Sequence, residues 1–303
     1  MSVLARRTGW GGLLVALPGL AFLAWFLLRP LARLVVDSFR QTTFGVTAPG
    51  FTLANYQAVF VDAGLRQSLV TTVVLSAAVT AITLVVCTPA ALTLARSGPR
   101  LSAVVDAILV FPLAFPGIVI GFFVIVLLGR NGLASQLLET TTGEPGARWA
   151  YTAGGLAAAY VYFCIPRVIG TLRGAASTLD PDLPVVAASL GAYPMRVAAT
   201  VTMPLLRAPL LASAGVCMAT CLGAYGTAAT LSEGIRVLPL DVADALYTRG
   251  DQGSAAALSV VLAVLAVLSL VLCTAVARLL ERRSPRSGTD LPLVLAPVAQ
   301  VAR

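Results

Sequence analysis

The chain alternates long apolar runs with short segments that carry nearly all of its charge. Crossing a hydrocarbon core takes about 20 apolar residues, and six runs without Asp, Glu or Arg approach or exceed that length. Because a bilayer offers no water to unpaired backbone groups, and the runs are too long and uniformly apolar for barrel strands, the pattern predicts helices. The predicted spans are Trp10 to Leu28, Gln67 to Ala95, Ala107 to Gly129, Trp149 to Pro166, Ala208 to Ser232 and Gln252 to Ala277.

Composition supports the same fold class. The 303 residues are 58% hydrophobic and 11% charged, with a mean hydropathy of +0.91, whereas soluble domains carry about 25% charged residues. A soluble globular protein is therefore excluded. We predict an all-α membrane protein in which residues 1–283 form one domain of six transmembrane helices. Residues 284–303 contain Pro, Ser and Gly and are predicted to form a mobile tail.

The placement of arginine predicts the orientation. All 21 basic residues are Arg. With the N-terminus inside, thirteen Arg and five acidic residues fall on the inner side, and eight of each fall outside. This bias places both termini in the cytoplasm, in a multi-pass protein of the cytoplasmic membrane that contacts lipid. Topology thus explains the net charge of +8, and no nucleic-acid partner is expected. Arg6 and Arg7 could begin a secretory signal, but the apolar run after them is too long and lacks a clear cleavage site.

Missing residue types exclude most catalytic functions. The chain contains no His and no Lys, so it cannot provide a Ser-His nucleophile, a Schiff-base lysine, a His metal site or the lysine of a phosphate-binding loop. We predict no catalytic residues and no cofactor. Cys217 and Cys221 lie four residues apart on one helix face, which is a possible metal pair. Without His or a nearby acid, a packing role is predicted instead, and no metal site.

The loop at about 178–207, between the fourth and fifth spans, is unusually apolar. Pro194 suits the first turn of a helix running to Met203, Gly191 permits a turn before it, and Pro204 is expected to end or bend the element. A first short helix is predicted from near Leu183. The pattern alone leaves two interpretations open: an amphipathic connector lying on the lipid, or a pair of helices held by another protein.

A sequence resemblance favours the second interpretation. The loop resembles the EAA loop of the inner-membrane permease subunits of binding-protein-dependent ABC importers, in which an E-A-A triplet, a Gly and an aliphatic-x-L-P unit have fixed spacing. The family Glu falls on Val185 and the first Ala on Val186, which puts the polar part of the contact in doubt. The matching residues are Ala187, Gly191, Ala192, Pro194, Val201, Met203 and Pro204, and weaker similarity extends from about Phe51 to Arg278.

The resemblance implies a division of labour between chains. ABC ATPase subunits would bind ATP and hold the two loop helices, a second permease subunit would complete a homodimer or heterodimer, and an extracytoplasmic binding protein would deliver the solute. The segments GAYGTAATL and VLPLDVADALY are similar to the branch that handles polyamines, ferric iron, sulfate, thiamine or phosphonates. The implied ATPase-coupling residues are Val185, Ala187, Ala188, Gly191, Ala192, Tyr193, Pro194, Arg196 and Pro204.

Candidate pathway residues are neutral, because the span centres carry no charge. Glu233 and Arg236, just beyond the fifth span, either line the outer mouth or are ordinary surface charges. An ion-gradient-driven secondary transporter is the alternative function, but proton coupling requires an acid or His at mid-depth, and the spans have neither. The candidates are Pro112 and Pro116 in the third span and Tyr225, Gly226, Thr227 and Thr230 in the fifth, for which helix packing is an equally good explanation.

Overall fold

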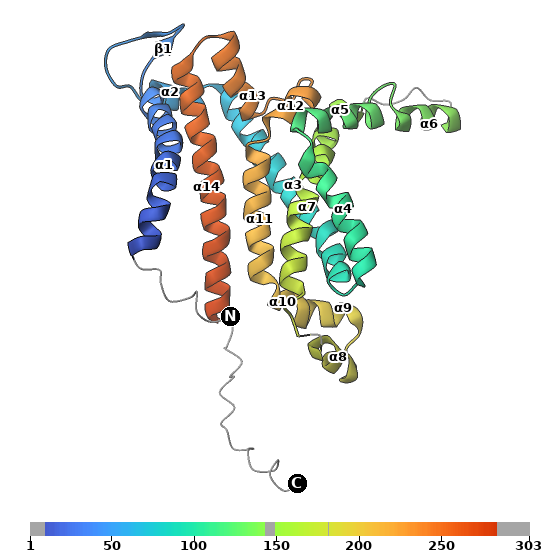
Figure 1. The fold of residues 1–303 in the computed structure, drawn as a ribbon. Helices are drawn as coiled ribbons and strands as arrows, with labels where there is room; N and C mark the ends of the chain where they lie inside the picture. Colours follow the sequence, from blue (N-terminus) through green and yellow to red (C-terminus); the bar gives the residue numbers. More distant parts are fainter. Residues whose placement is uncertain (1–9, 143–148, 181, 284–303) are drawn as a thin grey trace.

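The computed structural model describes residues 10–142, 149–180 and 182–283, and the predicted tail at 284–303 lies outside these. Four long helices run side by side along a bundle, and a fifth, shorter one packs beside them (Figure 1). The long helices are α3 (Ala63–Ala95), α7 (Ala153–Ala176), α11 (Arg207–Leu222) and α14 (Gln252–Arg283), and the shorter is α4 (Pro99–Ala114).

The core lies where α3, α7 and α11 meet. Val79, Leu156, Ala159 and Val168 are fully buried there, whereas large apolar side chains on α4 and α14 face outward, as expected in lipid. Small residues bring the helices close together. A Cβ at Gly215 of α11 would lie 3.3 Å from the Leu270 backbone of α14, so glycine allows that pair to pack nearly in contact.

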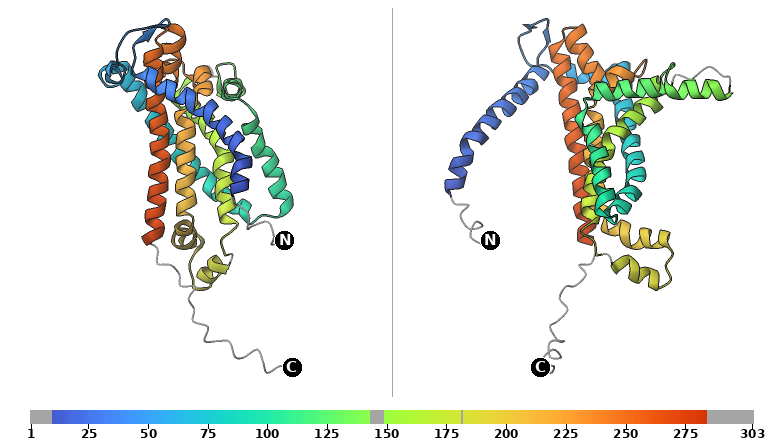
Figure 2. Two further views of the ribbon diagram at one scale, coloured as in Figure 1. Left: turned by 60° about the vertical axis from the view of Figure 1, so that its left-hand side comes forward. Right: turned by 45° about the vertical axis from the view of Figure 1, so that its right-hand side comes forward.

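The predicted third span is not one helix. It breaks at Phe115, whose extended backbone (φ −102°, ψ 138°) is the conformation that a following proline imposes. Pro116 then precedes α5 (Gly117–Leu128). α5 and α6 (Leu133–Thr142) run across the end of the bundle instead of along it (Figures 1 and 2). The prediction of a single helix over 107–129 was therefore wrong.

Other predicted spans also have different bounds. α7 continues to Ala176, ten residues beyond the predicted end of the fourth span at Pro166. α1 (Trp10–Ser38) continues ten residues beyond the predicted end at Leu28, through Arg29 and Pro30. The fifth span ends at Gly223, after which α12 (Tyr225–Leu231) forms a separate short helix. Within the described residues, five segments are long and apolar enough to cross a membrane, among them 117–141, or six if the bent segment 194–222 counts as one span.

α1 is largely separate from the rest. It packs against α14 near its C-terminal end, while its N-terminal part diverges from the bundle (Figure 2). A polar junction fixes its C-terminal end: the Asn55 amide donates hydrogen bonds of 2.9 Å to the carbonyl oxygens of Ser38 and Arg40, and the Tyr56 hydroxyl lies 2.6 Å from that of Ser38. The hairpin β1 (Thr42–Thr43) and β2 (Val46–Thr47) and helix α2 (Ala54–Val61) complete this junction.

Two ends of the bundle carry the candidate residues. One end, called the loop end here, holds α8 (Asp182–Ser189), α9 (Pro194–Val197), the π-helical turn η2 (Ala198–Thr202) and α10 (Met203–Leu205). The start of α1 and the end of α14 also lie toward the loop end (Figure 1). The opposite end, called the crossing end, holds α5, α6, α12, the 3₁₀ turn η1 (Trp149–Tyr151), α13 (Leu238–Ala243) and the π-helical turn η3 (Asp244–Thr248).

Candidate functional site

A glycine turn joins the two helices at the loop end. Gly191 has φ +84°, a left-handed conformation that L-residues with a Cβ adopt at a cost. Its N–H donates to the Ala188 carbonyl (2.9 Å), and the Ala192 N–H donates to the Ala187 carbonyl (3.2 Å). This pair of bonds is the Schellman arrangement that closes a helix C-terminus. The turn sets the angle between α8 and α9.

Two prolines shape the second half of the loop. Pro194 occupies the first turn of α9, as expected. Pro204 does not end the element, because it lies inside α10. A proline ring clashes with the carbonyl four residues earlier, and the backbone accommodates it with the π-helical turn Ala198–Thr202. The break falls at Leu206 (φ −92°, ψ 4°), where the chain bends by 72° into α11.

The loop carries a set of exposed apolar side chains, called the loop patch here. Leu190 is 84% and Met195 79% exposed, at positions on both sides of the turn. Soluble surfaces rarely carry such a cluster unless a partner or a membrane covers it. The loop patch consists of Val185, Val186, Leu190, Tyr193 and Met195.

The loop also packs on the bundle without filling the space there. Val197, Thr202 and Leu206 are buried. Two clefts of about 350 and 360 Å³ separate the loop helices from the ends of α3 and α7, and both are lined by Leu92, Arg96, Pro184 and Thr202. The loop is thus attached through α9–α10 while α8 stands off the bundle.

The remaining predicted loop residues fall within this arrangement. Ala187 and Ala188 lie on α8 and supply the acceptor carbonyls of the turn. Val185, at the family Glu position, is exposed, and its carbonyl accepts a hydrogen bond from the Ser189 hydroxyl (3.0 Å). Arg196 on α9 is exposed. The Asp180 carboxylate accepts a hydrogen bond from the Asp182 N–H (2.9 Å). An acidic residue that precedes α8 therefore caps the first residue of this helix.

At the crossing end, the helix that follows Pro116 meets the predicted pathway residues of α12. α5 packs on α12 through glycines: a Cβ at Gly226 would lie 3.0 Å from the Ile118 nitrogen, and one at Gly117 would lie 3.0 Å from the Thr227 hydroxyl. A Cβ at Gly121 would overlap the Thr230 hydroxyl. Pro112 is buried in α4 and Pro116 is exposed before α5. The break at Phe115–Pro116 is what brings α5 across α12.

The hydroxyl groups of α12 differ in their exposure. Tyr225 is exposed, whereas Thr227 is buried. The Thr230 hydroxyl donates to the Thr227 carbonyl of its own helix (2.9 Å), which is the packing arrangement that the sequence left open. The Tyr160 hydroxyl of α7 donates to the Ala224 carbonyl (3.0 Å) just before α12. Tyr225 is thus the most accessible hydroxyl of this set.

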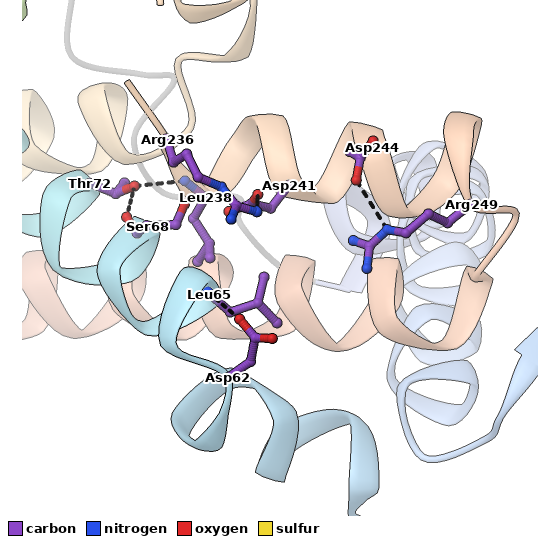
Figure 3. A network of polar contacts seen from close by, with 9 residues as sticks. All are labelled: Asp62, Leu65, Ser68, Thr72, Arg236, Leu238, Asp241, Asp244 and Arg249. Carbon is purple, nitrogen blue, oxygen red and sulfur yellow. Dashed lines mark hydrogen bonds and ion pairs between the residues drawn. The ribbon is translucent and has the colours of Figure 1, made fainter. Parts of the chain in front are cut away.

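A polar network fixes α13 on the same end (Figure 3). The Arg236 guanidinium donates to the Asp241 carboxylate (2.9 Å), whose side chain is 7% exposed. The Leu238 N–H, at the start of α13, donates to the Thr72 hydroxyl of α3 (2.8 Å). Arg236, which the sequence placed at a mouth or on the surface, is half exposed and pairs with a buried acid that sequence reasoning did not single out.

The start of α3 belongs to this network. The Asp62 carboxylate accepts the Leu65 N–H (2.9 Å) at the N-terminus of α3. That hydrogen bond, with the nearby charge of Arg236, lowers the pKa of Asp62 below its usual value. A Cβ at Gly64 would overlap the Arg236 guanidinium. The Thr72–Leu238 hydrogen bond and the charge of Arg236 beside Asp62 therefore connect the start of α3 to the segment that carries α13.

Two features in the bundle interior escaped the sequence reasoning. The buried face of α3 is rich in hydroxyl groups, which donate mainly to carbonyls one turn earlier, as in Thr72 to Ser68 (2.7 Å) and Thr80 to Ser76 (2.7 Å). Cys164 of α7 also joins Cys217 and Cys221 of α11, and the three sulfurs lie within 4.8 Å of one another. Helical spacing could have suggested the α3 stripe, but the thiol cluster depends on which helices pack together.

Comparison with known proteins agrees with these features. The chain is similar to the molybdenum transport system permease protein ModB of Mycobacterium tuberculosis (33% identity over 207 residues, 67% of this chain and 76% of that protein) and of Escherichia coli (30% over 188 residues, 61% and 81%).

The fold is similar to that of a bacterial ABC transporter that imports the acidic polysaccharide alginate (TM-score 0.72, 15% identity, 91% of this chain and 96% of that one). A complex of the alginate transporter with its alginate pentasaccharide-bound periplasmic protein matches equally well (TM-score 0.73, 13% identity, 90% and 96%). At these identities the likeness concerns the fold alone. The family of binding-protein-dependent transport system inner membrane components matches residues 87–284, and the chain, with its several apolar helices, is a multi-pass inner-membrane member of that family.

Proposed function

We propose that this chain is one permease subunit of an ATP-driven importer of molybdate. The choice of molybdate as the substrate rests on the similarity to molybdenum permeases of several organisms. Molybdate was not among the substrates that the sequence resemblance suggested. It is a tetrahedral dianion like sulfate, which was among them, and a sulfate permease is a weaker match (25% identity).

The loop patch is the proposed contact with the ATPase. Its apolar side chains stand on a bent helix pair that continues through α10 into α11, so a movement of α8 and α9 would be transmitted to a membrane helix. The clefts beside Arg96 and Pro184 leave room for such a movement. With Val185 in place of the family Glu, the contact is expected to be mainly apolar.

We propose that the loop end faces the cytoplasm. Both ends of the described chain lie toward the loop end, and the arginine bias places both termini inside. Arg96, Arg100, Arg173 and Arg207 lie at that end too, in or beside the helix ends. The crossing end would then face outward and receive the binding protein.

The proposed pathway runs beside α12, between two permease subunits. A neutral lining suits an oxyanion that must enter and leave, because a fixed buried charge would either trap it or repel it. The exposed Tyr225 hydroxyl can donate a hydrogen bond to a molybdate oxygen, whereas Thr227 and Thr230 act mainly in holding α12 against α5. Selectivity is then expected to reside largely in the binding protein.

Transport in proteoliposomes tests the function. The chain is reconstituted with its ATPase and binding protein, and uptake of molybdate is measured with and without ATP. We expect uptake that requires all three components and ATP. Uptake driven by an ion gradient without ATP would contradict the importer assignment. ATP-dependent uptake of sulfate but not molybdate would support the importer function and refute molybdate as its substrate.

A second experiment tests the loop patch. Met195→Asp places a charge in the proposed contact, and Val61→Asp places one at an equally exposed apolar position at the far end of the molecule. Interface hot spots are worth about 2 kcal/mol or more, or roughly 30-fold in affinity. We expect Met195→Asp to weaken ATPase binding by about that factor and Val61→Asp to leave it unchanged. Equal binding by the two variants would exclude the patch.

A further inference from the structure

Three cysteine thiols converge in the centre of the bundle. Cys164 projects from α7, and Cys217 and Cys221 project from successive turns of α11, with the Cys164 and Cys221 sulfurs 3.6 Å apart. All three side chains are buried, and none forms a disulfide. The cluster is remote from the loop patch. Cys221 lies one turn before α12, and its carbonyl accepts the Ala224 N–H (3.2 Å), but the proposed transport function assigns no role to the three thiols.

The geometry suits a small thiophilic ion. Because the sulfurs lie within 4.8 Å of one another, a point exists within about 2.8 Å of all three, close to a zinc–thiolate bond of about 2.3 Å. Small side-chain rotations would close the remaining gap. The hydroxyls of Thr80 and Thr83 on α3 lie against Cys217 and can orient it. No carboxylate belongs to this group among the described residues.

Ligand chemistry and charge limit which ion fits. Thiolates select soft ions such as Cu⁺, whereas structural zinc sites have four ligands, and this cluster supplies three. Burying an unbalanced charge at mid-membrane depth costs about 2.5–3.5 kcal/mol on insertion scales. A monovalent ion avoids that cost: it binds as one thiol loses its proton to solvent, and the other two thiols coordinate as neutral donors. The bound centre is then uncharged.

We propose that Cys164, Cys217 and Cys221 form a buried site for a monovalent thiophilic ion, Cu⁺ in the cell. α7 enters the 178–207 loop and α11 leaves it, so a bound ion would tie together the two helices that flank the loop. From Cys217 to Arg207 is ten residues, or about 15 Å of helix. An occupied site would therefore restrict relative movement of α7 and α11 at a point well removed from the loop.

Silver binding tests the site. Ag⁺ is a redox-inert analogue of Cu⁺, and the purified full-length protein in chloride-free detergent buffer is titrated with it and examined by native mass spectrometry. We expect one tightly bound ion per chain and a raised thermal unfolding midpoint. Losing a partner outside the coordination sphere already costs 10–100-fold in metal affinity, so Cys217→Ala should weaken binding by at least about 100-fold. Cys164→Ala tests the same ligand set from the other helix if the first variant does not fold.

Two cysteines outside the cluster serve as controls. Cys273→Ala on α14 and Cys87→Ala on α3 should each keep the tight ion. Loss of tight binding in either control, or tight binding that survives Cys164→Ala or Cys217→Ala, would overturn the proposal. Tight binding of Cd²⁺ in place of Ag⁺ would overturn the choice of a monovalent ion. A mass 2 Da lower without bound metal would show that Cys164 and Cys221 form a disulfide instead, which would also overturn it.

Discussion

Replacing Gly191 should uncouple ATP hydrolysis from transport without preventing membrane insertion. The residue has φ +84°, and no atom lies within 4 Å of the position that a Cβ would occupy. A larger side chain therefore causes no clash, and its whole effect is conformational. The left-handed region costs an ordinary L-residue roughly 1–2 kcal/mol, which changes a local equilibrium about 5- to 30-fold.

The turn can escape that strain only by giving up its hydrogen bonds. The two bonds that close α8, from the N–H groups of Gly191 and Ala192, contribute about 0.5–1.5 kcal/mol each. Strain and lost bonds are thus similar in size, so the variant should populate a second orientation of α8 relative to α9. Because α8 is exposed and stands off the bundle, the free energy of unfolding of the whole protein should change little.

A graded series separates conformation from side-chain bulk. Asn tolerates the left-handed region better than other non-glycine residues, and β-branched residues tolerate it least. We expect the number of ATP molecules hydrolysed per molybdate imported to rise in the order Gly191→Asn, Gly191→Ala, Gly191→Val. The matched control is Gly174→Ala in α7, which also has open space around its Cβ position but no positive φ. That variant should behave like the unmodified protein.

The assay measures ATP hydrolysis and molybdate uptake in the same proteoliposomes. Membrane insertion is checked by the yield of monodisperse protein in detergent. An unchanged ratio of hydrolysis to uptake for Gly191→Val would refute the reasoning. So would a series in which Gly191→Asn is as harmful as Gly191→Val, because backbone conformation would then not be the cause.

Two further predictions concern the crossing end. Gly121→Ala should overpack the α5–α12 contact, which should lower the free energy of unfolding by about 1–3 kcal/mol and lower molybdate uptake. Adding Thr230→Ala should partly restore both. No recovery in the double variant would count against a steric cause. Arg236→Ala leaves the buried Asp241 carboxylate unpaired and should cost about 1–3 kcal/mol in the free energy of unfolding. Arg249→Ala breaks an exposed pair with Asp244 and should cost about 0–1 kcal/mol; thermal unfolding in detergent that ranks the two variants equally would contradict this difference.

The local elements of the loop followed from residue chemistry. Gly191 can adopt the left-handed conformation that other residues avoid, and Pro194 has a fixed φ that suits a first helical turn, so a turn followed by a helix start could be predicted without knowing any neighbour. The effect of Pro204 could not be predicted in this way, because a proline inside a helix can end it, kink it or be accommodated by a π-helical turn. Packing of Thr202 and Leu206 on the bundle accompanies the third outcome here and places the bend at Leu206.

The break in the third predicted span could not be predicted from the sequence either. Pro112 and Pro116 are compatible with an irregular helix, but hydropathy is identical for a kinked span and for two helices at a steep angle. Glycines on both partners, Gly117 and Gly121 on α5 and Gly226 on α12, allow the backbones to meet. That meeting, together with the break at Phe115, holds α5 across the bundle and brings together residues about 110 positions apart in sequence.

Sequence by itself determined that this chain is a mostly helical membrane protein, because runs of apolar residues need no neighbours to be interpreted. It also predicted that the chain has no catalytic residues and that a turn forms at Gly191. The tertiary structure alone decided which helices are continuous, that Arg236 pairs with a buried acid, and that three cysteines from two helices converge. The physical reason is that solvation and backbone conformation are properties of each segment, whereas contacts depend on how segments pack.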